Sequence, residues 1–376
     1  MVHGIYVNAV IMALMVFFSC KGGSDGDDRS SSGTSFTLKD YYSSNADLDN
    51  KVDLIYNGLS DGQRVAQMII SSAGSNGKSE NEVQGLINDG IIGGVIYLGG
   101  SKDEFTSMSS QLQKSAMDNA GYPLLISTDG EPSLINRKIS GIQEFPKTSE
   151  ITTTEDASKI GAEIADILKS MGINHNYAPV CDYGFNKEII STRSFGGEES
   201  GVGKLAGAFI TATQDNGVIA TAKHFPGHGN VSGDSHNKVV YINGELKELS
   251  IFKQAIDAGV ISVMAGHIAI KGNPQYNTDG LPSTLSRDII TGLLRNELGF
   301  KGLIVTDGMN MGAVMKLGNA SLKAFKAGCD LIIMEPDERS LHTSIMKEIS
   351  SSEDMRSQME ESVKRIIRAK VCLGLW

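Results

Sequence analysis

Short apolar segments alternate with longer amphipathic segments along nearly the whole chain after residue 50, and this alternation restricts the possible folds more than any other feature. The short segments have the length and the β-branched content of buried strands. Eight of them are predicted as strands, at 67–72, 92–98, 123–128, 173–178, 217–222, 260–265, 302–306 and 330–334. Between them lie helical patterns such as 154–171, where apolar residues recur every three or four positions after a Thr-rich cap.

Continuous apolar strands that are separated by helices predict a parallel sheet whose outer face is covered. Eight strand–helix units therefore predict an α/β fold that closes into a (β/α)8 barrel of the TIM type. Such a barrel takes roughly 250 residues or more. The chain of 376 residues therefore needs only a single large domain, predicted over 50–376. An open, doubly wound sheet is the alternative.

The charge of the chain argues against two classes of partner. The sequence holds 34 Lys and Arg residues against 44 Asp and Glu residues, which gives a formal net charge of -10 at pH 7. The phosphates of nucleic acids and anionic lipid surfaces repel such a protein. We therefore expect no nucleic-acid partner and no basic membrane-binding face, and we expect a monomer.

The first twenty residues predict a targeting segment rather than part of the fold. Ile5–Phe18 is almost uninterruptedly apolar, but it is shorter than a typical membrane-spanning helix and stops at Ser19 and Cys20. This pattern is similar to a bacterial lipoprotein signal, in which Cys20 carries the lipid after cleavage. Residues 21–49 are predicted as a flexible tether. An uncleaved anchor and plain secretion are the alternatives, and all three place the protein in the cell envelope or outside, with no other membrane contact.

Polar side chains stand where five of the predicted strands end. They are Asp129, Asp182, the pair Lys223 and His224, His267, and Asp307. Because the carboxyl ends of barrel strands face one mouth, we expect these side chains to surround one site. A single Asp in such a place is often only a helix cap. Five placements together favour a functional site.

The polar run Lys223–Gly229, with the sequence KHFPGHG, is followed closely by Asp234, Ser235 and His236. A carboxylate two residues from an imidazole can orient and charge it for proton transfer. Asp307 has no basic neighbour in sequence and can serve as a nucleophile or base. A carboxylate nucleophile with a separate proton donor is what glycoside hydrolysis requires. Further groups are predicted to bind sugar hydroxyls, namely the donors Lys223, His224 and Arg193 and the acceptor Asp129.

Two other classes of function remain open from these residues. A zinc or other metal hydrolase can use imidazole and carboxylate ligands. Its ligands would be His224, His228, Asp234 and His236. These would crowd one glycine-rich loop and leave Asp307 and Lys223 without roles. A catalytically silent lipoprotein that binds cell-wall sugars is the second alternative, and an intact Asp307 argues against it.

The run 223–236 resembles the signature loop of the family 3 glycoside hydrolases, specifically their β-N-acetylglucosaminidase branch. Four further segments support the resemblance, at 176–182, 193–196, 264–268 and 299–307. The similarity covers roughly residues 50–373. It implies a TIM-type barrel without the extra C-terminal domain that many members carry.

The resemblance also implies a mechanism and a substrate. Asp307 would be the nucleophile of a retaining double displacement, His236 the acid/base, and Asp234 the group that orients the imidazole. The terminal N-acetylglucosamine would be held by residues at matching positions, namely Lys223, His224, Arg193 and Asp129. No metal and no other cofactor is implied. The expected activity is removal of non-reducing terminal β-linked N-acetylglucosamine from glycans or muropeptides of the cell wall.

Two positions depart from the family pattern. Residues 129–134 read DGEPSL where the family usually has DQEGGR, and Gly308 follows Asp307 where the family commonly has Asp or Ala. These departures concern substrate contacts more than reaction class. A β-glucosidase and a phosphorylase of the same family remain alternatives, since a histidine acid/base does not repel phosphate as a carboxylate would. Within the loop, we expect Lys223 and His224 to be rigid and the glycines from Gly227 to Gly233 to form a hinge.

Overall fold

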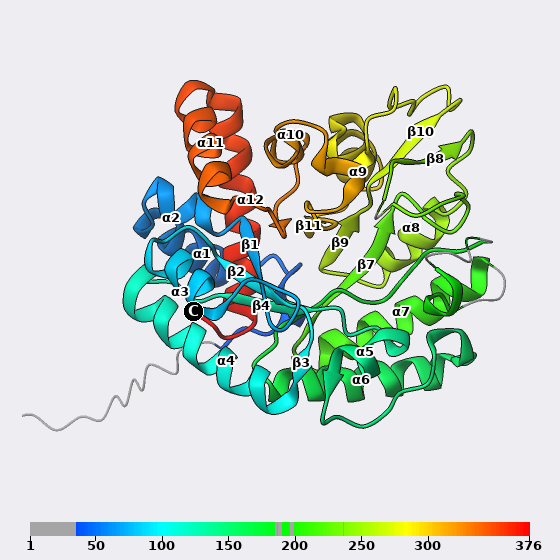
Figure 1. Ribbon diagram of the computed structural model, residues 1–376, viewed down its shortest axis with the longest axis horizontal. Helices are drawn as coiled ribbons and strands as arrows, with labels where there is room; N and C mark the ends of the chain where they lie inside the picture. Colours follow the sequence, from blue (N-terminus) through cyan, green and yellow to red (C-terminus); the bar gives the residue numbers. More distant parts are fainter. Residues whose placement is uncertain (1–34, 185, 187–189, 196–198, 236) are drawn as a thin grey trace, which may run out of the picture. The chain divides into compact units, whose positions relative to one another are not determined.

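The computed structural model describes residues 35–376 except 185, 187–189, 196–198 and 236 (Figure 1). Two of the predicted functional residues, the lipid-bearing Cys20 and the acid/base His236, therefore lie outside the described residues. Residues from Ser35 to Trp376 form one compact unit.

Eight parallel strands form the centre of this unit (Figure 1). They are β1 Ile69–Ala73, β2 Gly94–Tyr97, β4 Leu125–Thr128, β6 His175–Asn176, β7 Ile219–Phe225, β9 Ser262–Ala265, β11 Leu303–Thr306 and β12 Ile332–Ile333. Their order is β11-β9-β7-β6-β4-β2-β1-β12. A parallel bridge between Val305 and Leu331 joins the two edges of the sheet, and the Thr306 amide donates to the Leu331 carbonyl at 2.9 Å. The predicted barrel is confirmed, and the open doubly wound alternative is wrong.

Helices cover the outside of the barrel (Figure 1). Their bounds are α1 Ala46–Gly58, α2 Asp61–Ala66, α3 Glu80–Asn88, α4 Lys102–Ser115, α5 Pro132–Lys138, α6 Thr154–Ser170, α7 Glu199–Asp215, α8 Leu249–Asp257, α9 Gly312–Met315, α10 Ala320–Ala327, α11 Glu338–Ser351 and α12 Glu353–Cys372. The helical periodicity predicted α6 correctly, and Thr153 caps it by accepting a hydrogen bond from the Asp156 amide. In the described part of the chain, no helix combines the length and the apolar character that a membrane crossing needs.

Shorter elements join these layers. Two small parallel pairs are β3 Gly100–Ser101 with β5 Ile139–Ser140, and β8 Val240–Asn243 with β10 Ile268–Lys271. Among the described residues, four short segments are 3-10 helices, namely η1 Leu38–Asp40, η3 Thr148–Glu150, η4 Ser191–Arg193 and η5 Ser283–Leu285. Two further segments of the described chain are π helices, namely η2 Ala116–Ala120 and η6 Asp288–Glu297. Three of the 3-10 helices, η3, η4 and η5, lie in connections that follow strands and so belong to the loops on the side of the mouth.

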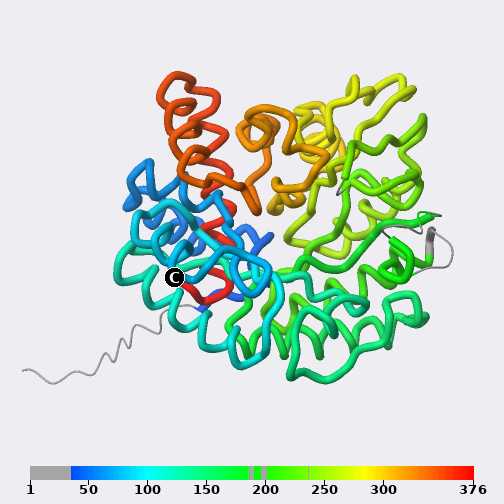
Figure 2. The backbone as a smooth tube through the Cα atoms, in the orientation of Figure 1, coloured from blue at the N-terminus to red at the C-terminus, as the bar shows by residue number. Residues whose placement is uncertain are grey.

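The start of the described chain packs against its end, as Figure 2 shows by the meeting of blue and red segments. Arg368 in α12 donates to the Tyr41 carbonyl at 2.5 Å, and Lys51 in α1 donates to the Trp376 carbonyl at 2.8 Å. Leu48 is fully buried between these elements. The tether predicted over 21–49 is therefore wrong for residues 38–49, which fold as part of the body.

The amino-terminal end of the barrel is closed by side chains from both of these regions. The Tyr42 hydroxyl donates to the carbonyl of Val260, just before β9, at 2.6 Å. From α12, the ammonium of Lys370 donates to the carbonyls of Gly93 and Pro123, just before β2 and β4, at 3.0 and 2.6 Å. Burial lowers the pKa of Lys370 well below its ordinary value. The two regions thus cover the face of the barrel opposite the predicted site.

Two leucines on α1 test whether this region belongs to the fold. Leu48 has no exposed surface, whereas 75% of Leu54 is exposed. We expect Leu48→Ala to lower the free energy of unfolding by about 3 kcal/mol, because it removes a buried side chain and leaves a cavity. Leu54→Ala, the matched control, should change it by less than about 0.5 kcal/mol. Urea denaturation of both variants measures the difference, and equal values would contradict the placement of α1 in the core.

Candidate active site

The predicted polar residues gather at the carboxyl ends of the strands. Asp129 follows β4 directly, and Asp307 follows β11. Lys223 and His224 lie within the last three residues of β7, which runs to Phe225 and not to 222 as predicted. Asp129 and Asp307 line the same cavity of about 370 Å³, together with Lys138. This mouth cavity is the candidate active site.

A network of alternating charges stands at one side of the mouth cavity. The Lys223 ammonium lies 2.7 Å from a carboxylate oxygen of Asp129 and 2.6 Å from one of Glu131. Arg193 binds Glu131 through two nitrogens, at 2.8 and 2.7 Å. Lys138 lies 2.5 Å from the second oxygen of Asp129. Each charge has an opposite partner, which is the condition under which charges can be buried.

Electrostatics keeps Lys223, Asp129 and Glu131 charged. Burial alone would lower the pKa of Lys223, but Asp129 and Glu131 raise it by more. Burial likewise favours neutral carboxyls, yet Lys138 and Lys223 bring the pKa of Asp129 far below its usual range. The guanidinium of Arg193 and the ammonium of Lys223 lower the pKa of Glu131 to about 2. The network therefore presents fixed ammonium and carboxylate groups, which suit the hydroxyls of a sugar.

Two members of the network, Glu131 and Lys138, were not among the predicted site residues. Glu131 immediately precedes α5, and Lys138 is the last residue of that helix. Lys138 stands nine positions after Asp129 and reaches it only because the short helix α5 turns the chain back. Glu131 could have been predicted as a site residue, because it stands two positions after Asp129 at the end of a strand. For Lys138 the sequence offered no such signal, since the length and direction of α5 decide its contact.

His224 belongs to a second cluster, whose centre is the buried carboxylate of Asp182. The imidazole Nδ1 lies 2.6 Å from Asp182 Oδ2, and the other carboxylate oxygen accepts the amides of His224 and His228 at 3.1 and 2.7 Å. Burial would raise the pKa of Asp182, but the adjacent His224 lowers it by more. An ionised Asp182 accepts a hydrogen bond from Nδ1–H and thereby sets the ring orientation of His224.

Asp307 is held at the end of β11 by its own backbone and its neighbours. Its amide donates to the Ala265 carbonyl at 2.9 Å, and its carboxylate accepts the Gly308 amide at 2.8 Å. His267 donates from Nε2 to the Gly308 carbonyl at 3.0 Å, which fixes the adjoining peptide. Burial raises the pKa of Asp307, but His224 and His267 lower it by more. The structure thus supplies an ionised, oriented carboxylate in the mouth cavity, as a nucleophile requires.

The loop after β7 is packed more tightly than its glycines predicted. A Cβ atom on Gly227 would lie 2.2 Å from Glu248 Oε2, and one on Gly229 would lie 2.2 Å from the Tyr183 carbonyl oxygen. The buried Glu248 accepts the amides of Tyr183 and Gly229 at 2.8 and 2.9 Å. Glycine is therefore needed at Gly227 and Gly229 for close approach of the backbone, and the hinge expected from Gly227 to Gly233 stays a prediction.

Two of the residues proposed as metal ligands, His224 and His228, bind different partners. The rings of His224 and His228 have centroids 6.0 Å apart, and each is engaged by other side chains. Among the residues that the structure describes, no group of three or more His, Cys, Asp and Glu side chains could hold a metal ion. The described part of the loop therefore gives the metal-hydrolase alternative no preformed ligand set.

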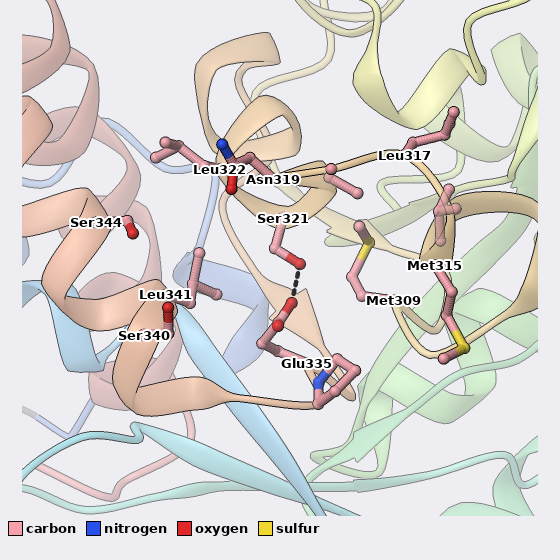
Figure 3. Close-up of a pocket in the computed structure, with 14 residues that line it drawn as sticks. Met309, Met315, Leu317, Asn319, Ser321, Leu322, Glu335, Ser340, Leu341 and Ser344 are labelled. Carbon is pink, nitrogen blue, oxygen red and sulfur yellow. Dashed lines mark hydrogen bonds between the residues drawn. The ribbon is translucent and has the colours of Figure 1, made fainter.

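A second cavity, of about 350 Å³, lies beside the mouth between α9, α10 and α11. Figure 3 shows the Ser321 hydroxyl and the Glu335 carboxylate pointing toward each other within it, and these two groups are hydrogen bonded. Methionine and leucine side chains form much of its remaining wall. None of the predicted site residues is among the described residues that line it, so the chemistry is assigned to the mouth cavity.

The burial of Glu248 should make the free energy of unfolding depend on pH. Burial, followed by the nearby Asp182, raises the pKa of Glu248 from 4.5 to about 8. The folded state thus binds this proton more tightly than the unfolded state, so the contribution of Glu248 to stability falls as pH rises through this interval. The free energy of unfolding of Glu248→Gln, which stays neutral, should exceed that of the native protein by roughly 4 kcal/mol at pH 8.5 and by less than about 1 kcal/mol at pH 5.

Thermal unfolding at the two pH values checks this expectation. The exposed Glu144→Gln is the control and should shift neither value. A gain for Glu248→Gln that is equal at both pH values would show that Glu248 is not protonated in the folded protein near neutrality.

A family model described as the N-terminal domain of glycosyl hydrolase family 3 matches residues 62–369. A β-hexosaminidase of Nitrosomonas eutropha is 31% identical over 313 residues, which cover 77% of this chain and 87% of that protein. A β-hexosaminidase of Vibrio cholerae serotype O1 is 31% identical over 259 residues, covering 66% and 77%.

Solved structures of related enzymes have the same fold as this chain. A family 3 β-N-acetylglucosaminidase from Paenibacillus sp. superimposes with a TM-score of 0.76 at 31% identity; the match covers 84% of this chain but only 63% of that one. A β-N-acetylhexosaminidase from Beutenbergia cavernae shows the same fold, with a TM-score of 0.74 at 24% identity and coverage of 83% and 98%. The chain belongs to glycosyl hydrolase family 3 and is a glycoside hydrolase.

Proposed function

We propose that the protein is a retaining exo-β-N-acetylglucosaminidase that removes non-reducing terminal β-linked N-acetylglucosamine. The observation that carries the reaction class is the ionised Asp307 beside the charged network in one cavity. The similarity to proteins named β-hexosaminidase and β-N-acetylglucosaminidase supports the choice of sugar. A carboxylate nucleophile and a separate acid/base are the elements of a retaining mechanism.

In the first step, the Asp307 carboxylate attacks the anomeric carbon, and the bond from that carbon to the leaving oxygen breaks. His236 gives its proton to this oxygen, so that the sugar becomes an ester of Asp307. In the second step, His236 takes a proton from water, which attacks the same carbon and releases Asp307 as a carboxylate. The low pKa of Asp307 keeps it ionised for the first step and makes it a good leaving group in the second.

The charged network is proposed to bind the hydroxyl groups of the terminal sugar. Lys223, Lys138 and Arg193 can donate hydrogen bonds, and Asp129 and Glu131 can accept them. A cavity of about 370 Å³ lies near the lower end of the range for small-molecule sites. This size suits one sugar unit better than a continuous polysaccharide, which supports an enzyme that acts on chain ends.

The proposed substrates are peptidoglycan fragments in the cell envelope. The apolar segment that ends at Cys20 supports a lipid anchor or secretion, and a cell-wall glycan would then be the available source of N-acetylglucosamine. Incorporation of labelled palmitate, compared between the native protein and Cys20→Ala, tests the anchor independently of activity.

A panel of chromogenic substrates tests the sugar. The body from Ser35 to Trp376 should hydrolyse the β-N-acetylglucosaminide with a higher kcat/KM than the matching β-glucoside and β-xyloside. A higher value on the glucoside would overturn the substrate and favour the β-glucosidase alternative. Adding inorganic phosphate separates hydrolysis from phosphorolysis, because a phosphorylase would be stimulated and would release a sugar 1-phosphate in place of the free sugar.

The nucleophile is tested by variants of two aspartates. Asp307→Ala should lower kcat by at least about 10⁴-fold, because the covalent intermediate cannot form. Asp118→Ala should leave kcat unchanged, since Asp118 is on the surface with 57% of its side chain exposed. A 5-fluoro glycosyl fluoride should label the native protein on the peptide that contains Asp307, as detected by mass spectrometry. Labelling of another carboxylate would contradict the assignment.

A further inference from the structure

His228 lies in the loop after β7 and has no place in the mechanism described above. Only 1% of its surface is exposed. Its backbone amide donates at 2.7 Å to the carboxylate of Asp182, which also orients the ring of His224. The backbone of His228 is thus fixed to the candidate active site before its side chain is considered.

Both ring nitrogens of His228 have side-chain partners. Nδ1 lies 3.0 Å from the amide nitrogen of Asn186, and Nε2 lies 2.9 Å from the hydroxyl of Ser235. Asn186 stands in the loop after β6, so the ring of His228 connects two loops of the mouth. Ser235 is itself buried, with 2% of its surface exposed.

The surroundings decide which nitrogen carries the proton. The amide nitrogen of Asn186 also reaches the carbonyls of His228 and Gly233, at 3.1 and 3.4 Å, and carbonyls only accept hydrogen bonds. The Asn186 nitrogen is therefore a donor, and Nδ1 of His228 accepts from it. The proton is then on Nε2, which donates to the Ser235 hydroxyl. Burial lowers the pKa of His228, in agreement with a neutral ring.

Ser235 stands between Asp234 and His236 in the chain. The Asp234 carboxylate accepts a hydrogen bond from the side-chain amide of Asn237 at 3.0 Å, and the Asp234 carbonyl accepts one from the Asn237 backbone amide at 3.2 Å. Bonds between neighbouring residues do not fix where Asp234 and Ser235 lie relative to the barrel. The His228–Ser235 hydrogen bond ties the Ser235 side chain to the buried base of the loop.

We propose that His228 is a positioning residue for the acid/base step, acting through the Ser235 hydroxyl to place the Asp234–Ser235 segment at the mouth. This inference rests on the proposed function, because it assigns a purpose to the segment only if that segment carries the acid/base. General acid–base catalysis needs its group within hydrogen-bond reach of the reacting atom. If the segment were displaced from the mouth, its acid/base could not reach the leaving oxygen.

Three variants separate the Nε2 hydrogen bond from the rest of the ring. In His228→Gln, the side-chain amide nitrogen stands as many bonds from Cβ as Nε2 does and can still donate to Ser235. In His228→Asn, the side chain can accept from Asn186 but is too short to reach Ser235. Ser235→Ala removes only the hydroxyl. If the hydrogen bond from His228 Nε2 to Ser235 positions the acid/base, His228→Asn and Ser235→Ala should lose similar amounts of activity. His228→Gln should retain most of the activity.

The readout is kcat on a β-N-acetylglucosaminide with a poor, alkyl leaving group, compared with the rate of glycosyl-enzyme formation from one with a dinitrophenyl leaving group, which needs no protonation. We expect His228→Asn and Ser235→Ala to lower kcat on the alkyl substrate by about 10- to 100-fold, a part of the usual contribution of general acid catalysis. The rate of glycosyl-enzyme formation from the dinitrophenyl substrate, measured as a burst, should change by less than about twofold. The double variant should be no slower than either single variant, because both remove one bond.

Any of four outcomes would overturn the inference. If both rates fall equally, or if the losses follow a fall in the thermal unfolding temperature, His228 has only a structural role. If the effects of His228→Asn and Ser235→Ala multiply, the two residues act independently. His236→Ala is the reference: if it remains fully active on the alkyl substrate, the proposed function is wrong. If His236→Ala is slow while Ser235→Ala and His228→Asn are not, only this inference is wrong.

Discussion

The buried ammonium of Lys223 is the constraint on which the candidate site depends. Its side chain is 2% exposed and would be costly to bury alone, so Asp129 and Glu131 must stand within hydrogen-bond distance of it. These carboxylates come from the end of β4, and Lys223 comes from the end of β7, so the ion pairs join two strands that are not neighbours in the sheet. The pairs hold the binding groups in place before any sugar arrives, which is the preorganisation that sugar recognition requires.

The two clusters of polar residues at the mouth have different roles. The network around Lys223 is saturated with opposite charges and suits binding. The cluster around Asp182 consists of imidazoles and one carboxylate, and it connects His224, His228 and the loop after β7. His224 also lowers the pKa of Asp307, so the orientation that Asp182 imposes on this ring affects the nucleophile. A single buried carboxylate thereby influences both the nucleophile and the loop assigned to proton transfer.

The barrel could be predicted because its strands are buried on both faces and therefore read as continuous apolar runs. The placement of Asp129, Lys223 and Asp307 followed from the same pattern, since residues after parallel strands meet at one mouth. Lys138 and the role of Asp182 could not be predicted, because their contacts depend on the exact turn of α5 and on the path of the loops. Residues 38–49 were misread as a tether because their apolar side chains are few and widely spaced, yet Tyr41 and Leu48 are buried against α12.

The contact between Tyr42 and Val260 places the first described segment of the chain at one end of the barrel. Tyr42 lies at the amino-terminal end of the strands, where a Cβ atom on Gly302, just before β11, would come within 2.6 Å of its hydroxyl. The site lies at the opposite end, after the strands. The segment around Tyr42 therefore closes the floor of the barrel and leaves the mouth uncovered, so the support of the fold and the binding of a sugar are served by opposite faces.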